Sequence, residues 1–175
     1  MLHTYTPSPE ADLLLLRWWD QLVVQGELVP AFGPRMLSLS TFFQTFQPPT
    51  LCLLGVEAVE QRLWFVAWVE PALSGGLFCL WVAPEKRQSK QMIAAGVDAL
   101  EACFQHYPVL LAATADPRLA LEYQKIGCTP LGTVPQLFGD RDVETLYLTK
   151  ADFITRILPL RQLVTSTNGE EARNG

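Results

Sequence analysis

Histidine is scarce in this chain, and the cysteines lack the spacing of a metal site. The two histidines, His3 and His106, do not pair with cysteines at ligand spacing, and no CxxC motif is present. A zinc site or a redox pair is therefore not expected. The four cysteines each lie in an apolar run, which is typical of reduced, buried thiols in a cytoplasmic protein: Cys52, Cys79, Cys103 and Cys128.

Charge is also low. Charged residues make up only 18% of the 175 residues and hydrophobic residues 49%, a composition that favours a folded globular chain. The net charge of −5, with no basic patch, argues against a nucleic-acid partner. There is no signal-peptide pattern and no apolar run long enough to span a bilayer, so no membrane partner and a cytoplasmic location are expected.

Several catalytic motifs are missing too. The sequence contains no GxSxG, no P-loop and no HExxH, which removes the common signatures of serine hydrolases, P-loop nucleotide hydrolases and zinc proteases. A chain of this length is most simply one domain. Because its end is polar and rich in small residues, we expect a single domain over residues 1–160 and a flexible C-terminal tail over residues 161–175.

The first third of the chain predicts two helices. The Ser8-Pro9 pair is typical of a helix start, and the helix is expected to end at Gly26. Its apolar residues cover most of its circumference, so it is either buried or carries an apolar outer face that meets a partner. A loop over residues 26–36 precedes a short helix that begins at Ser38 or Ser40.

The remainder predicts a sheet with two more helices. Near-continuous apolar runs with short linkers favour an antiparallel meander, and a later change to a three-to-four residue period favours a helix. The strand–helix–strand unit implies one parallel pair with a right-handed crossover. The expected order is strands at 50–59, 61–69 and 77–82 (after a Ser74-Gly75-Gly76 turn), helix 88–105, strand 108–114, a helix from Asp116 to Gly127, strands 129–138 and 142–150, and a last helical segment at 152–158.

Two segments of the second half carry a recognisable pattern. In the first, a strand leads into a helix with Val82, Pro84 and Arg87 at fixed spacing. The start of a helix has unpaired N–H groups and a dipole that favours an anion. The second is a capped helix ending in a glycine, with these residues in frame: Asp116, Leu119, Tyr123, Lys125, Gly127 and Cys128.

Together, in this order, the two segments resemble the acyl-CoA-binding core of the GNAT superfamily of N-acetyltransferases. The resemblance implies an α/β (α+β) fold: a mixed, mostly antiparallel twisted sheet with helices on both faces. The family has glycines at the positions of Lys90 and Met92. A lysine could place its ammonium on a phosphate, whereas a methionine would crowd the pocket.

The resemblance implies transfer of an acetyl group from acetyl-CoA to an amine by direct attack. Tyr123 is then the general acid that protonates the CoA thiolate, since the two groups have comparable pKa values. The residues expected to hold acetyl-CoA are Trp81, Val82, Arg87, Gln88, Ser89, Lys90, Gln91, Met92 and Asp116. The acceptor is a small-molecule or peptide amine that the sequence does not identify, and neither Glu57 nor Glu70 is singled out as the general base.

A second hypothesis is a GNAT-fold protein without activity. The chain is also similar to small GNAT-like proteins of tailed bacteriophages, for which a virion or assembly role has been proposed. The replaced loop glycines favour this alternative, as do Trp18 and Trp19 on the first helix, because aromatic residues are common at interfaces. That helix would then bind a protein partner or a second copy of the chain. In such a protein Tyr123 would only pack against the sheet, and Arg87 and Lys90 would be solvated surface charges.

Overall fold

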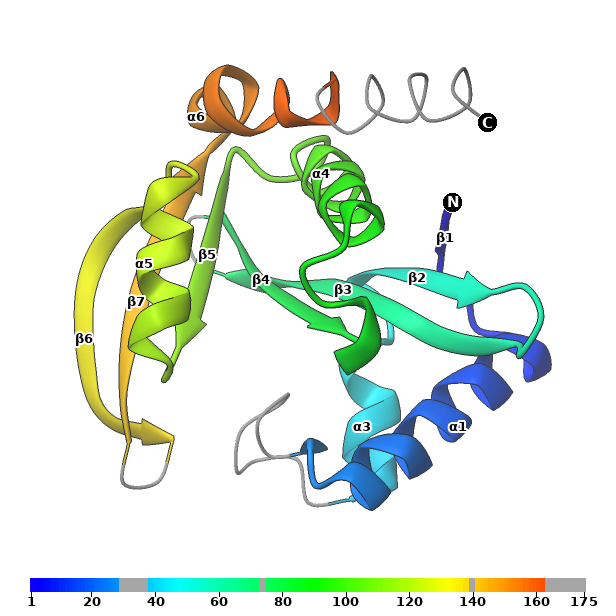
Figure 1. Ribbon diagram of the computed structural model, residues 1–175. Helices are drawn as coiled ribbons and strands as arrows, with labels where there is room; N and C mark the ends of the chain where they lie inside the picture. Colours follow the sequence, from blue (N-terminus) through cyan, green and yellow to red (C-terminus); the bar gives the residue numbers. More distant parts are fainter. Residues whose placement is uncertain (29–37, 73–74, 139–140, 163–175) are drawn as a thin grey trace.

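The computed structural model describes residues 1–28, 38–72, 75–138 and 141–162 (Figure 1). Within them, seven strands form one mixed sheet in the order β1-β2-β3-β4-β5-β7-β6. Neighbouring strands are antiparallel except for β4 and β5, which are parallel. The strands are β1 (Leu2–Thr4), β2 (Leu51–Glu57), β3 (Arg62–Ala72), β4 (Gly75–Val82), β5 (Val109–Thr114), β6 (Thr129–Phe138) and β7 (Arg141–Thr149).

The helices begin where side-chain caps satisfy the free N–H groups of the first turn. Ser8 caps α1 (Pro9–Gln25), Ser38 caps α3 (Leu39–Thr45), Ser89 caps α4 (Lys90–Cys103), and Asp116 caps α5 (Pro117–Lys125). The predicted helix starts at Ser8 and Asp116 are confirmed. A 3-10 turn, η1 (Pro84–Lys86), follows β4, and a short helix, α6 (Lys150–Asp152), leads into a π-helical turn, η2 (Phe153–Ile157).

Three details differ from the sequence-based prediction. Helix α4 begins at Lys90 rather than at residue 88, because Gln88 has a positive φ of 65° and Ser89 is the cap. Gly75 and Gly76 belong to β4 and not to a turn. The short strand β1 was not predicted, since three residues carry no readable pattern.

Helices cover both faces of the sheet, as expected. In Figure 1, α4 lies above β2, β3 and β4, and α1 and α3 lie below them. The lower layer is an aromatic cluster around Trp18 of α1, which is 1% exposed. Its ring lies between 5.3 and 6.4 Å from four others: Phe42, Phe46, Trp68 and Trp81. No helix among the described residues is both long and apolar enough to cross a membrane.

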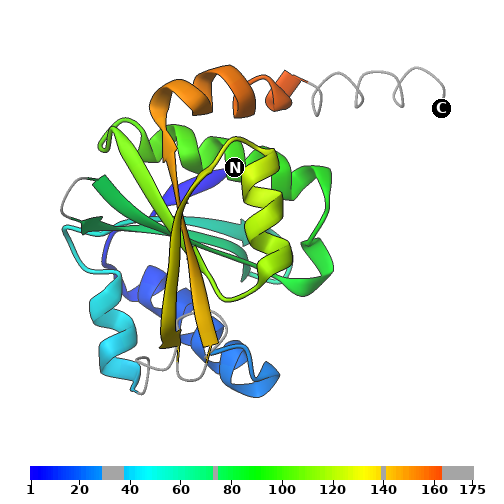
Figure 2. The ribbon, with the colours of Figure 1, turned by 90° about the vertical axis from the view of Figure 1, so that its left-hand side faces the viewer.

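A second core lies between α4 and the C-terminal helical segment. Phe104, after α4, packs against Phe153 at a ring distance of 5.1 Å. Arg161 ties this segment to α4 through Asp98 at 2.6 Å and Glu101 at 2.8 Å. Figure 2 shows α6 and the turns after it running alongside α4. The tail expected over residues 161–175 lies outside the described residues from position 163 onward.

The contact between β4 and β5 depends on two glycines at the start of β4. A Cβ atom on Gly75 would overlap the backbone carbonyl oxygen of Val109, and one on Gly76 would overlap a methyl group of Val69 and crowd the Tyr107 ring. A larger residue at position 75 would push β4 and β5 apart, because backbone at this distance cannot yield. Gly75 is therefore needed for the close approach of the two strands, and Gly76 for the packing of Val69 and Tyr107 against β4.

This requirement is testable by protein stability. Gly75→Ala should lower the free energy of unfolding by about 2 kcal/mol or more, because the new methyl group meets backbone. Gly96→Ala, in the middle of α4 where no atom lies within 4 Å of the added methyl, should instead raise it by about 0.5–1 kcal/mol. Urea denaturation of both variants measures the difference. Equal effects would contradict the packing role of Gly75.

Candidate cofactor-binding and transfer site

The sheet opens between its two parallel strands. β4 and β5 are paired only at Gly76 with Leu110 and at Leu77 with Leu111, although β4 continues to Val82 and β5 to Thr114. We call the diverging part, beyond Leu77 and Leu111, the wedge. Along the wedge, the N–H and C=O groups of β4 that point toward β5 have no partner in the ladder. The carbonyl of Val82 accepts a hydrogen bond from Nε of Arg87 at 3.0 Å, and the groups before it along this edge can bind a ligand with its own amide groups.

The turn after β4 presents a second set of free donors. Ser89 caps α4 by accepting a hydrogen bond from the N–H of Met92 at 3.1 Å, and its own hydroxyl donates to the carbonyl of Lys86 at 2.7 Å. Among the hydrogen bonds of the described residues, none uses the N–H groups of Gln88, Lys90 and Gln91. These three donors, at the positive end of the helix dipole, form an arrangement that suits an anion.

The two side chains at the family's glycine positions take different directions. Lys90 is exposed at the start of α4, so its ammonium can reach an anion at the free N–H groups. Met92 is half-buried and packs against the aromatic core. The prediction that Met92 would crowd an anion at this turn stays a prediction, since the packing of its side chain against the core does not test it.

The other residues expected to hold the cofactor have partners of their own. Trp81 is buried against Trp18 and its main chain is paired with Val66 of β3, so neither its ring nor its backbone faces the wedge. Asp116 caps α5 by accepting a hydrogen bond from the N–H of Arg118 at 2.9 Å. Arg87 is bound to Glu27, with 2.9 Å between Nη2 and Oε1.

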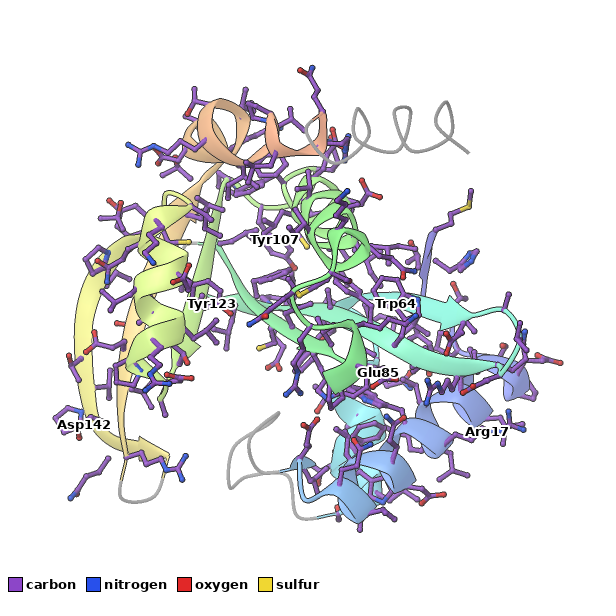
Figure 3. The ribbon with its side chains drawn as sticks, viewed as in Figure 1. Arg17, Trp64, Glu85, Tyr107, Tyr123 and Asp142 are labelled. Carbon is purple, nitrogen blue, oxygen red and sulfur yellow. The ribbon has the colours of Figure 1, made fainter. Side chains whose placement is uncertain are left out.

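Tyr123 lies beside the wedge. Figure 3 shows it on the side of α5 that faces β4. Burial raises its pKa to about 12, and the nearby thiols of Cys128 and Cys79, which are negative when ionised, add to the shift. The tyrosine is therefore a neutral phenol at physiological pH, and Cys79 of β4 is one of its neighbours.

The sequence offered Glu57 and Glu70 as proton acceptors without a choice between them. In the structure their hydrogen-bond and ion-pair partners differ. Glu57 is bound to Arg62 at 2.9 Å and to Lys86 at 3.4 Å, and the hydrogen bond from Arg62 lowers its pKa most. Glu70 takes part in no ion pair among the described residues, and its Oε1 accepts a 3.3 Å hydrogen bond from the indole N–H of Trp68. Glu57 is thus part of a surface ion-pair network, whereas Glu70 is available.

The register of β3 and β4 brings Glu70 to the closed end of the wedge. Glu70 is paired with Leu77, the last residue of β4 that contacts β5 in the ladder, and Trp68 is paired with Cys79. Directly paired residues share a face of the sheet, so Glu70 and Cys79 are diagonal neighbours. Consistently, burial and then Glu70 raise the pKa of Cys79 to about 12. Glu70, Cys79 and Tyr123 therefore gather at one end of β4.

Sequence reasoning missed Glu27 and did not select Glu70. Glu27 is 54 residues from Trp81 and 60 from Arg87, a separation at which no local pattern exists. Glu70 could be chosen only once the strand register was known.

A separate hollow of about 340 Å³ lies between β1, β2 and the start of α1, lined by residues that include His3, Tyr5 and Leu14. None of the residues predicted to bind a cofactor or to act in catalysis lines it. The chemistry-bearing residues are thus gathered at the wedge and not at this hollow.

The chain matches no family model and no curated protein sequence. Its structure, however, is similar to those of known acetyltransferases. A mutant of spermidine N-acetyltransferase SpeG from Vibrio cholerae aligns with a TM-score of 0.64 and 14% identity over 89% of this chain and 98% of that one. ElaA from Escherichia coli aligns with a TM-score of 0.61 and 18% identity, over 84% and 98% of the two chains.

RimJ from Mycobacterium smegmatis, solved in complex with CoA-disulfide, aligns with a TM-score of 0.63 and 13% identity over 94% of this chain and 89% of that one. These structures share the fold of the GNAT superfamily. The chain therefore has the GNAT fold, a mixed α/β sheet covered by helices, as the two sequence segments implied.

Proposed function

We propose that the protein is an acyl-CoA-dependent N-acyltransferase that moves an acetyl group from acetyl-CoA to an amine by direct attack. The observation that carries the proposal is the wedge between β4 and β5, with free N–H groups at one end and Tyr123 at the other. The structural neighbours named above, which are acetyltransferases or share their fold, support this chemistry. At identities of 13–18% they support it through the fold alone.

The residues present fit acetyl-CoA. The N–H groups of Gln88, Lys90 and Gln91 would bind the pyrophosphate, helped by the Lys90 ammonium. The unpaired backbone edge of β4 beyond Leu77 would bind the amide groups of the pantetheine arm, as an added strand would. Val82 would take part through its main-chain N–H, because its carbonyl already accepts a hydrogen bond from Arg87 and Trp81 is paired with β3. Acetyl-CoA supplies the activated acetyl group as its thioester.

The transfer step needs a proton acceptor and a proton donor. The acceptor arrives as an ammonium ion and must lose a proton before its nitrogen can attack the thioester carbonyl. A C–N bond then forms, the C–S bond breaks, the nitrogen loses its second proton as the amide forms, and the thiolate takes up a proton. The second proton from nitrogen replaces the one given to the thiolate, so one proton in total is released. Tyr123 is the donor in this proposal, because burial keeps its phenol protonated. Glu70 is the acceptor of the first proton, because it lies at the same end of the wedge and pairs with no cation in the part of the chain that the structure describes.

The features that favoured a non-catalytic interaction protein have a structural explanation. Trp18 is fully buried, and Trp19 packs against Phe42 at 5.1 Å. The exposed apolar residues of α1, such as Leu13 and Val24, are separated on its surface by Arg17 and Asp20. The aromatic residues of α1 therefore serve the core, and no continuous apolar stripe runs along the helix.

The function as a whole is tested by binding and turnover. Titration calorimetry of the purified protein with acetyl-CoA should give a Kd in about the micromolar range, and a screen of amines should reveal release of free CoA thiol together with an acetylated product. Absence of both binding and product would rule the proposed function out.

The role of Tyr123 is tested by removing only its hydroxyl group. Tyr123→Phe should lower kcat about a hundredfold and leave the Kd for acetyl-CoA nearly unchanged, because the donor acts only as the C–S bond breaks. With a pKa of about 12, Tyr123 should also cause no fall in the wild-type rate below about pH 11. Tyr107→Phe, which removes a hydroxyl from the loop between α4 and β5 (Figure 3), is the control. Equal loss of binding and turnover in Tyr123→Phe would exclude the acid role.

The role of Glu70 is tested against Glu57, the other carboxylate that the sequence offered. Glu70→Gln should lower kcat about a hundredfold and shift the rising limb of the pH–rate profile to higher pH. Without the carboxylate, only substrate amine that has already lost its proton to solvent can react. Glu57→Gln should leave kcat unchanged. Acetyl-CoA titration and thermal unfolding of both variants confirm that the cofactor site and the fold are intact. Unchanged turnover in Glu70→Gln would assign the proton acceptor to another group or to water.

A further inference from the structure

The end of α1 holds Glu27 under the exit of β4. Gly26 ends the helix with a positive φ of 68°, and the N–H of Glu27 donates to the carbonyl of Leu22 at 2.9 Å. This is the hydrogen-bond pattern of a glycine-terminated helix, which fixes the backbone of the residue after the glycine. The position of the Glu27 carboxylate is therefore set by the helix end and not by a free loop.

That carboxylate binds two residues predicted to contact acetyl-CoA. The indole N–H of Trp81 donates to Oε2 at 2.9 Å. Nη2 of Arg87 donates to Oε1 at 2.9 Å and to Oε2 at 3.1 Å, while Nε of Arg87 donates to the carbonyl of Val82 at 3.0 Å. Arg87, one residue before the free N–H of Gln88, is thus held against α1 by an internal anion.

We propose that Glu27 is a built-in competitor of acetyl-CoA: it occupies Arg87 in the free protein and must release it when a phosphate group of the cofactor binds at the start of α4. This inference rests on the proposed function. The arginine is the only part of the turn that changes partner. The backbone donors of Gln88, Lys90 and Gln91 are open in both states.

The contacts favour exchange over a permanent ion pair. The Arg87 side chain is 49% exposed, so water screens its attraction to Glu27 and leaves room for the guanidinium to turn. A phosphate offers more negative charge and the same two-pronged geometry. Glu27 does not become an isolated buried charge on release, because the Trp81 N–H still donates to it and 20% of its side chain is exposed.

A specific coupling between the two residues follows. In the wild type, the binding free energy gained from an Arg87–phosphate contact is offset by the loss of the Glu27–Arg87 ion pair. Arg87 therefore contributes little to the net affinity for acetyl-CoA. Without the Glu27 charge, Arg87 has no ion pair to give up before acetyl-CoA binds. Its contact with phosphate then adds fully to the binding free energy. The effect of removing Arg87 should therefore depend on the residue at position 27.

The test is a double-mutant cycle measured as the Kd for acetyl-CoA, with wild type, Glu27→Gln, Arg87→Ala and the double variant. Glutamine keeps an oxygen that can accept the Trp81 N–H, so the packing is retained. Glu85→Gln is the matched control: Glu85 lies in the same turn (Figure 3), but pairs with Arg62 at 2.8 Å. Thermal unfolding of each variant confirms the fold.

Glu27→Gln should tighten acetyl-CoA binding about fivefold, and Arg87→Ala should cost about fivefold in that background but less than twofold in the wild type. Glu85→Gln should change the Kd less than twofold. Unchanged or weaker binding by Glu27→Gln overturns the inference, as does equal tightening by Glu85→Gln, which would indicate a general charge effect. Binding by Glu27→Gln alone supports it. No binding by any variant refutes the proposed function and the inference with it, whereas tight wild-type binding without coupling refutes the inference only.

Discussion

The close approach of Gly75 to the backbone carbonyl of Val109 brings the start of β4 against β5. The two strands pair at two positions there and then separate. Where β4 and β5 separate, two different sets of polar groups lie at opposite ends of β4. The exit of β4 leads to the free N–H groups at the start of α4, and its beginning lies near Tyr123 and Glu70.

The polarity of the surroundings assigns these groups their charge states. Burial raises the pKa of Tyr123, Cys79 and Cys128, which favours the neutral form of all three groups at physiological pH. The carboxylates differ through their partners among the described residues: Glu57 belongs to a network with Arg62 and Lys86, whereas Glu70 accepts a hydrogen bond from the indole N–H of Trp68. The register of β3 against β4 thus places Glu70, and not Glu57, near the point where β4 and β5 separate.

The fold could be read largely from the sequence because its signals are local. The caps at Ser8 and Asp116 and the glycine at position 26 act within one helical turn, so their meaning does not depend on the rest of the chain. The site was less predictable. The contacts of Glu27 with Trp81 and Arg87 join segments more than 50 residues apart, and the choice of Glu70 over Glu57 required the pairing of β3 with β4. Long-range pairing leaves no trace in a single sequence.

The second core has a bearing on synthesis. The apolar side of α4 is completed by Phe153 and Ile157, and Arg161 ties α4 down through Asp98 and Glu101. On the ribosome, every strand of the sheet emerges before these residues do. One side of α4 therefore stays uncovered during synthesis until a segment about 50 residues after the end of the helix has emerged. The packing of α4 against the sheet is complete only when the last helical segment of the described chain has been made.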